Sequence, residues 1–274
     1  MIPLNSNLSA LKRSQIRVYT NLARATEDCA MLTIGEPDLN TPEEIKEGFL
    51  GTISQKNGRL YDLFRDRVMF PVIDNTGNVI AFSGRDVGGQ DNRKYVNSSD
   101  TPAFQKRRNL FALNFAKNHC ADQLILCEGN IDVVSLHAAG FENAVASLGT
   151  ALTDEQARIL AKYTKQVILA YDSDEAGQRA AHRAMGIFAK VGLDVRILQM
   201  QGAKDPDELI QRNPELWQDA VAHGVPAVEW LLKKYEETVD LSSAPGKRKY
   251  SDVALKLLDY VKDEIERASY EEKV

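Results

Sequence analysis

Acidic side chains follow each of three short apolar segments in this sequence. The segments and their acids are Leu124–Cys127 with Glu128, Gln166–Tyr171 with Asp172 and Asp174, and Asp194–Gln199 with Asp205 and Asp207. Short apolar segments between polar residues are typical of buried strands in a parallel sheet. Since ligands bind where the carboxyl ends of such strands meet, we expect these acids to lie together. Unpaired carboxylates are unfavourable inside a protein, and a metal ion is the simplest compensation.

The two Asp-x-Asp pairs have a second interpretation. Residues two apart lie on one side of an extended segment, so Asp172 and Asp174 could face a single ion. The same pair could instead cap the helix predicted for Glu175–Lys190. Asp205 could likewise be the N-cap of a helix at Pro206–Gln211, with the proline in its first turn.

Glu128 and Asp132 form the remaining acidic pair. Glu128 precedes Gly129 at the end of its predicted strand, where it could be a catalytic acid or base, a metal ligand or simply an exposed acid. Asp132 lies near the start of a helix predicted for Ile131–Ala139, where the helix dipole favours an acid.

A basic stretch precedes the acids. Residues 56–108 contain ten lysines and arginines and six aspartates, an excess of four positive charges in a chain of net charge −5. Phe64, Tyr95 and Phe104 are interleaved with these charges, which suits a phosphate backbone or triphosphate with stacked bases. A solvated face with scattered salt bridges would have the same composition. Acids that hold divalent ions beside bases that hold phosphates would support phosphoryl or nucleotidyl chemistry.

The composition is that of an ordinary globular protein. The 274 residues are 43% hydrophobic and 27% charged, enough for one large or two modest domains. The three cysteines, Cys29, Cys120 and Cys127, lack a metal-type spacing, so we expect reduced thiols in a cytoplasmic protein. No apolar run approaches the roughly 18 residues of a membrane span, and no signal-peptide pattern is present, so no membrane partner is expected.

The pattern of elements predicts an α/β fold with a mostly parallel sheet flanked by helices. A β-rich basic subdomain precedes this sheet, with a hairpin formed by Val68–Ile73 and Asn78–Ser83. A helical subdomain follows it, with helices predicted at Ala227–Tyr235 and Tyr250–Ala268. The expected divisions are residues 1–50, 51–118, 119–212 and 213–274.

Residues 1–47 differ from the rest of the chain. They resemble the N-terminal arm of pyridoxal-phosphate aminotransferases of the aspartate aminotransferase superfamily, notably in GEPD at residues 35–38 and in Thr41-Pro42. The likeness covers Leu4–Gly48 and then stops, without a counterpart for the lysine that carries the cofactor. A cofactor enzyme cannot be built from its first helix and strand. We therefore interpret this part as a foreign or fused segment without aminotransferase activity, and expect no pyridoxal phosphate.

From about residue 51 the acids occur within a wider pattern. The spacing Glu128-Gly129-x-x-Asp132, Asp172-x-Asp174 and Asp205-x-Asp207 resembles the motifs of the Toprim domain. The flanking sequences RLYDLFRDRVMFPVID, AVASLGTALTDEQ, YDSDEAGQRAA and KDPDELI are similar to the RNA-polymerase core of bacterial DnaG-type primases. The resemblance implies a Toprim-type sheet at residues 119–212 and the synthesis of short RNA primers on single-stranded DNA from nucleoside triphosphates, with Mg²⁺ or Mn²⁺.

The resemblance also implies roles for individual residues. Glu128 resembles the catalytic glutamate of the family, Asp172 and Asp174 are also expected to take part in catalysis, and Asp132 resembles a supporting acid. The acids expected to bind metal are Glu128, Asp132, Asp172, Asp174, Asp205 and Asp207. The basic residues expected to bind nucleotide or DNA are Arg67, Arg85, Lys94, Lys106 and Arg107. Asn130 stands where an aromatic residue is common in the family, and Arg107 stands where a small residue is frequent.

Departures from the family pattern leave other functions open. The chain has no Cys/His set for a zinc-binding domain, so no zinc is expected, and the N-terminal part of the polymerase core has no counterpart. The replicative helicase is a partner in the family, but its binding domain is expected to be absent, although Ala244–Val274 resembles the first of the core's C-terminal helices. Another Toprim enzyme, such as a nuclease or topoisomerase relative, and an inactive fused fragment remain alternatives.

Overall fold

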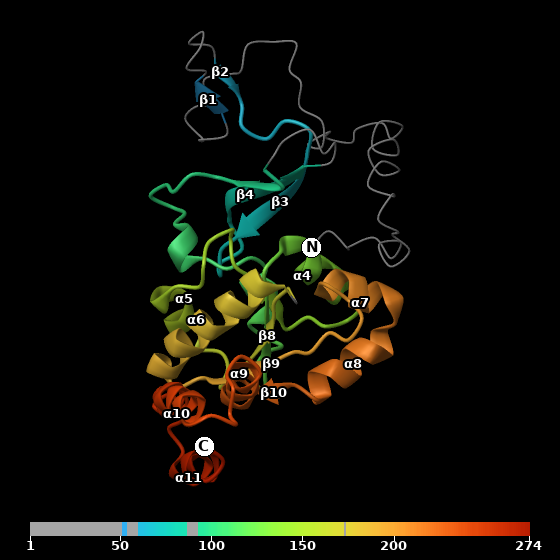
Figure 1. Ribbon diagram of the computed structural model, residues 1–274. Helices are drawn as coiled ribbons and strands as arrows, with labels where there is room; N and C mark the ends of the chain where they lie inside the picture. The colour runs from blue at the N-terminus through green and yellow to red at the C-terminus, as the bar shows by residue number, and fades with distance from the viewer. Residues whose placement is uncertain (1–50, 54–59, 87–92, 173) are drawn as a thin grey trace. The chain divides into compact units, whose positions relative to one another are not determined.

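The chain divides into two units, Met1–Asn114 and Phe115–Val274. The computed structural model describes residues 51–53, 60–86, 93–172 and 174–274 (Figure 1). The segment that resembles an aminotransferase lies outside the described residues. In this structure, none of the helices among these residues is long and apolar enough to cross a membrane.

The described part of the first unit contains antiparallel strands. Strands β1 (Gly51–Ile53) and β2 (Leu60–Asp62) form one pair, and β3 (Arg67–Ile73), β4 (Val79–Asp86) and β5 (Tyr95–Asn97) form a sheet in the order β3-β4-β5. The Asp74 carboxylate accepts hydrogen bonds from the backbone N–H groups of Thr76 and Asn78, both at 2.9 Å, which fixes the β3–β4 turn. The predicted hairpin is therefore confirmed. A short 3₁₀ helix, η2 (Lys106–Arg108), and α3 (Leu113–Ala116) follow.

The second unit contains a five-stranded sheet in the order β10-β9-β8-β6-β7. Its strands are β6 (Leu124–Cys127), β7 (Ala144–Ala146), β8 (Gln166–Ala170), β9 (Asp194–Ile197) and β10 (Val225–Pro226). Every pair is parallel except β9 with β10. The predicted mostly parallel sheet is confirmed. The sequence did not predict β7, which is short and alanine-rich, or the edge strand β10, which contains a proline.

Helices cover both faces of this sheet. Figure 1 shows α4 (Asn130–Ala138), α7 (Pro206–Arg212) and α8 (Pro214–Ala222) on one side, and α5 (Asp154–Leu160), α6 (Glu175–Val191) and α9 (Ala227–Glu236) on the other. All four residues of β6 are buried, as are four of the five in β8. Strands covered on both faces need such continuous apolar sequences, which explains why the sequence marked these two strands clearly.

The C-terminal helices differ from the prediction. The prediction of a single helix at Tyr250–Ala268 was wrong, because the structure has two helices there, α10 (Ala244–Leu258) and α11 (Glu264–Glu271). Asp263 separates them, since its carboxylate accepts hydrogen bonds from the N–H groups of Ile265 and Glu266 at 3.0 and 2.8 Å. An aspartate followed three residues later by a glutamate is an N-terminal capping pattern, so the break had a signal in the sequence.

Candidate metal and nucleotide site

The strand order brings Glu128 beside Asp172. β6 pairs with β8 so that Cys127 lies opposite Ala170, and each acid follows the end of its strand within two residues. The chain leaves β6 into α4 on one face and leaves β8 into α6 on the other face. Such a switch point opens a crevice at the carboxyl ends of the strands. Across it, the Asp172 N–H donates to Glu128 Oε1 at 3.3 Å.

Asp174 is the N-cap of α6. Its Oδ1 accepts a hydrogen bond from the Gly177 N–H at 2.8 Å, and its side chain is exposed. A Cβ atom on Gly177 would overlap the carbonyl oxygen of Asp172, so only glycine allows α6 to begin this close to the end of β8. The helix start therefore holds Asp172 and Asp174 at the same edge of the sheet.

Asp205 is the N-cap of α7, as one of the two interpretations of the sequence predicted. Its Oδ1 accepts from the Glu208 N–H at 2.8 Å, and Pro206 occupies the first turn of the helix. The Asp205 side chain is half-buried. Each Asp-x-Asp pair therefore supplies one helix cap at the edge of the sheet, from Asp174 and Asp205.

The other two acids point inward and connect α4 with α7. Asp132 is 8% exposed and accepts from the N–H groups of Gly129 at 3.2 Å and Asp207 at 3.3 Å. Asp207 is 7% exposed, and its Oδ1 accepts from the Ser135 hydroxyl at 2.6 Å and from the Gln211 amide. The sequence assigned both acids to metal, but their oxygens accept hydrogen bonds that join the two helices.

The acids are close enough to influence one another electrostatically. Burial raises the pKa of Asp132 to about 7, and the negative charge of Asp205 is the next cause. The charges of Asp172 and Asp207 also raise this pKa, while the hydrogen bond from the Asp207 backbone opposes them. Like-charged carboxylates in one place favour the uptake of a proton or a cation.

The donor set fits a divalent metal ion that is shared with a substrate. Among the described residues, no three acidic, histidine or cysteine side chains are grouped as a ready-made metal cage. Mg²⁺ does not require one, because it is usually held by one or two carboxylates together with water and substrate phosphates. Carboxylate oxygens are also the ligands that Mg²⁺ and Mn²⁺ prefer. Glu128, Asp172, Asp174 and Asp205 offer such oxygens at this edge.

The predicted basic residues belong to the first unit, and Arg67 does not lie on its surface. Arg67 is 1% exposed, and its guanidinium donates to the carbonyl oxygens of Gly84 at 3.0 Å and Arg93 at 3.1 Å. A Cβ atom on Gly84 would collide with Phe64 and Arg67, so this glycine makes room for both. The geometry indicates that Arg67 fixes the sheet rather than contacts nucleic acid.

The other basic side chains are more accessible. Arg85 is half-buried, donates to the Tyr95 hydroxyl at 3.0 Å and lies 5.5 Å from the centre of that ring. Lys106 is half-buried, and Lys94 and Arg107 are exposed. These four residues remain candidates for phosphate binding.

The predicted stacking residues do not all reach the surface. Phe64 is 9% exposed and Phe104 is completely buried, so the prediction that they stack on bases was wrong. A small β-rich unit needs its few large apolar side chains for a core. Tyr95 is half-buried, and its ring lies beneath Arg85.

Several residues near the acids were missed in the sequence. Ser135 and Gln211 hold Asp207, and only the four-residue spacing of Gln211 from Asp207 on one helix face signalled a contact. Tyr171 directly follows β8 and lines the same cavity as Glu128. Burial raises the pKa of Tyr171, as do the charges of Glu128 and then Cys127, so its hydroxyl stays protonated.

Family models match most of the sequence that follows residue 32. A model described as Toprim-like matches residues 125–210, and a model of the N-terminal domain of the DNA primase catalytic core matches residues 33–117. A model of the DnaB-helicase binding domain of primase matches residues 228–274. The last match contradicts the expectation that this domain is absent from the chain.

Known proteins agree with these matches. A DNA primase of Clostridium acetobutylicum is 40% identical over 226 residues, which cover 82% of this chain and 38% of that protein. The solved primase catalytic core of Escherichia coli is 30% identical, with a TM-score of 0.76 and coverage of 98% of this chain and 90% of that one. The chain belongs to the bacterial DnaG-type primase family.

The chain covers different shares of the DnaG-type primases that it matches. A DnaG primase catalytic domain solved bound to single-stranded DNA is 29% identical, with a TM-score of 0.75, and the match covers 99% of this chain and 92% of that one. The chain spans less than half the length of the curated relatives it matches, 38% of the Clostridium enzyme. The boundary predicted near residue 50 stays a prediction. The match to the core's N-terminal domain begins earlier, at residue 33, which contradicts the expectation that the N-terminal part of the polymerase core has no counterpart in this chain. Membership of the family implies the use of divalent metal.

Proposed function

We propose that this chain is the catalytic core of a primase, which makes short RNA primers on single-stranded DNA from nucleoside triphosphates. The observation that supports this most directly is the meeting of Glu128 and Asp172 at the switch point of the sheet, in a chain of the DnaG-type primase family. The relative solved with single-stranded DNA supports the choice of template.

The acids at the open edge would carry the chemistry. Glu128 would accept the proton of the primer 3′ hydroxyl, whose oxygen then bonds to the α-phosphorus of the incoming nucleotide. The bond between that phosphorus and the oxygen bridging to the β-phosphate breaks, and pyrophosphate leaves. Asp172, Asp174 and Asp205 would hold Mg²⁺ or Mn²⁺, which when bound neutralises the phosphates and favours loss of the hydroxyl proton.

We assign a positioning role to Asp132 and Asp207. Both were expected to be metal ligands, but their oxygens accept hydrogen bonds from Gly129, Ser135, Gln211 and the Asp207 backbone. Asp132 would fix the backbone directly after Glu128. Asp207 would hold α7, whose N-cap is Asp205, against α4.

The accessible basic residues would bind phosphates. Arg85, Lys94, Lys106 and Arg107 lie in the first unit and would bind the phosphates of a nucleotide or of the template backbone. Arg67 is left out of this set, because its guanidinium is buried and bonded to backbone carbonyl groups.

A helicase partner and a cytoplasmic location complete the proposal. The match of residues 228–274 to the DnaB-helicase binding domain supports contact with a replicative helicase through the C-terminal helices. Bacterial DNA replication takes place in the cytoplasm, which is where such an enzyme would work.

Primer synthesis tests the proposal. The chain is incubated with single-stranded DNA, labelled nucleoside triphosphates and either Mg²⁺ or Mn²⁺, and the products are separated on a gel before and after alkali. We expect short, alkali-sensitive RNA that disappears when the metal is chelated. Cleavage of the DNA without new RNA would instead identify a Toprim nuclease, and the absence of any product in both metals would contradict polymerase activity of this chain.

A further inference from the structure

A cavity of about 340 Å³ opens beside Glu128 in the second unit. Its walls come from the loop after β7, from Tyr171 at the end of β8, and from one face of α6. A volume of a few hundred Å³ with few polar groups is typical of small-ligand sites. Glu128 is the only one of the predicted metal-binding acids that lines it.

The local sequence explains why this space is open. Ala176, Ala180 and Ala184 recur every four residues and so share one face of α6, where their small side chains leave room. Opposite them, Gly149 has a φ of 70°, a backbone conformation that glycine adopts easily and that turns the loop after β7. Thr150 in this loop adds a hydroxyl group to the lining.

Among the residues that the structure describes, Arg183 is the one cation that lines this cavity. Its side chain is exposed, and it makes no hydrogen bond or ion pair with the part of the chain that the structure describes. Arg179, one turn earlier on α6, is instead paired with Glu175, with Nη1 to Oε2 at 3.3 Å. A guanidinium without a carboxylate partner is well suited to bind a phosphate group.

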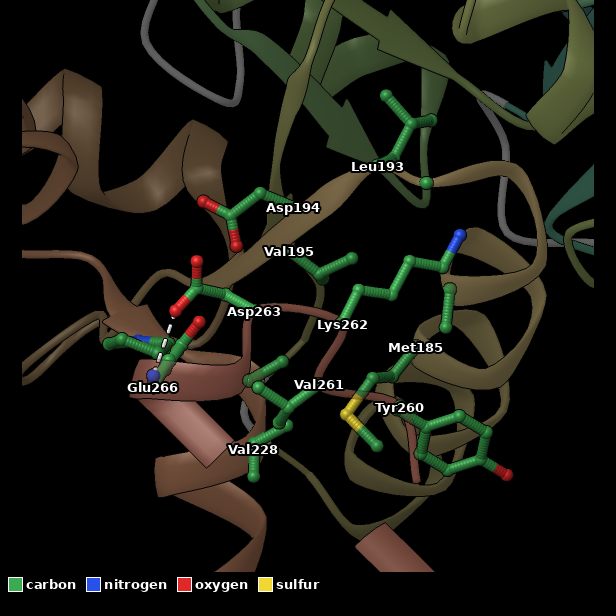
Figure 2. Close-up of a pocket in the computed structure, with 14 residues that line it drawn as sticks. Met185, Leu193, Asp194, Val195, Val228, Tyr260, Val261, Lys262, Asp263 and Glu266 are labelled. Carbon is green, nitrogen blue, oxygen red and sulfur yellow. Dashed lines mark hydrogen bonds between the residues drawn. The ribbon is translucent and has the colours of Figure 1, made fainter. Parts of the chain in front are cut away.

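A second cavity in this unit is lined by several carboxylates and is therefore less suited to bind a phosphate. The cavity in Figure 2 measures about 210 Å³ and includes Asp194, Asp263 and Glu266 in its lining, with Lys262 beside them. It lies at the amino end of β9, which begins at Asp194. The open edge of the sheet, with Glu128 and Asp172, lies at the carboxyl ends of the strands. Its carboxylates would repel a nucleotide, while the cavity beside Glu128 combines one arginine with one catalytic acid.

We propose that the cavity beside Glu128 is the subsite for the 3′-terminal nucleotide of the primer. Arg183 binds its phosphate, the alanine face of α6 receives the nucleoside, and the 3′ hydroxyl lies toward Glu128. One cation matches the single charge of a phosphodiester. A triphosphate with its metal ions would need Asp174 and Asp205, which do not line the cavity. This assignment rests on the proposed primase function.

Binding of primed and unprimed template tests the subsite without requiring turnover. The full chain and its variants are titrated with fluorescent DNA template, alone or annealed to a short RNA with a 3′ hydroxyl, in the presence of Ca²⁺. The wild-type chain should prefer the primed template. Arg183→Ala should reduce affinity for the primed template about tenfold, since it removes a hydrogen bond to a charged group, and change affinity for the bare template less than about twofold.

Matched variants sharpen the test. Arg179→Ala removes an exposed arginine from the same helix and should bind both templates like the wild type. Ala180→Leu fills the cavity with a good helix former and should reduce primed-template binding as Arg183→Ala does. Extension kinetics should show a raised KM for the primed template and an unchanged KM for nucleoside triphosphate.

The outcomes separate the subsite from the proposed function. A wild-type chain that prefers the primed template through Arg183 but never extends it keeps the subsite and contradicts the polymerase activity. If the Arg183→Ala variant extends primers as well as the wild type does, the polymerase activity is supported and the subsite is overturned. Equal losses in Arg179→Ala and Arg183→Ala, or no preference for the primed template in the wild type, would also overturn it.

Discussion

Two kinds of carboxylate lie at the same end of the second unit's sheet. Glu128, Asp172, Asp174 and Asp205 lie at its open edge, exposed or half-buried, while Asp132 and Asp207 are buried between α4 and α7. The buried acids accept hydrogen bonds on their oxygens from within the protein. Carboxylates of the same motifs therefore have different surroundings, although their chemical group is the same.

The difference shows how the site balances charge and stability. Buried carboxylates are tolerated when donors satisfy them, and here the donors connect the loop after β6 with the start of α7. The acids at the edge gain most from a cation, because their negative charges are close to one another and to Asp132. Burial of Asp132 and the charges of Asp205 and Asp172 raise the pKa of Asp132. Replacing members of each set should therefore change different properties.

Glu128→Gln should have the largest effect. The substitution removes the proposed base at the open edge while keeping its size, so primer synthesis should fall roughly 10²–10⁴-fold, with the thermal unfolding temperature unchanged. The control is Glu175→Gln, an exposed acid in the first turn of α6 whose pair with Arg179 contributes little. Comparable activity of the Glu128→Gln and Glu175→Gln variants would contradict the proposed role of Glu128 as the base.

Asp207→Ala should mainly reduce stability. It removes the acceptor that the half-buried Ser135 hydroxyl and the exposed Gln211 amide share and so breaks the link between α4 and α7, which costs roughly 1–3 kcal/mol of unfolding free energy. Urea unfolding followed by circular dichroism measures this loss. Asp174→Ala removes a helix cap and should cost about 1 kcal/mol. A larger loss of unfolding free energy in Asp174→Ala than in Asp207→Ala would contradict the view that the buried acids contribute more to stability than the exposed ones.

Asp132 should give the second unit a pH dependence. Its pKa in the folded state is about 7, above the ordinary value of 3.8, so the folded state binds the proton more tightly than the unfolded state. The stabilisation is complete below about pH 4 and is lost as pH rises through about 7. Relative to Asp132→Asn, the wild type should lose on the order of 2 kcal/mol between pH 5 and pH 8 in metal-free buffer. Parallel unfolding profiles of the two proteins would contradict the shift.

The strands and the acids that follow them could be predicted because their signal is local. Leu124–Cys127 forms β6 without any change of bounds, and Glu128 and Asp172 meet as parallel pairing requires. The direction of Asp207 could not be predicted from its spacing, because α7 begins at Pro206 and ends the extended conformation. One residue of helix is enough to turn Asp207 away from Asp205 and toward α4.

The basic unit shows a different limit. Its excess of positive charge could be counted in the sequence, but the count did not reveal that Arg67 lies at a buried position of β3. The burial of Phe64 and Phe104 depends on packing between segments far apart in the chain, which no local pattern encodes. Composition predicted a surface for phosphates, and only the structure shows which of the basic side chains are exposed and which are buried.

Mn²⁺ binding followed by electron paramagnetic resonance tests the division of the acids most directly. Binding is measured with and without nucleoside triphosphate for the wild type, Asp172→Asn and Asp207→Asn. We expect binding that tightens with the nucleotide, weakens about tenfold or more in Asp172→Asn, and changes less than about threefold in Asp207→Asn. Equal weakening in the two variants, or no effect of Asp172→Asn, would contradict the assignment of the metal to the open edge.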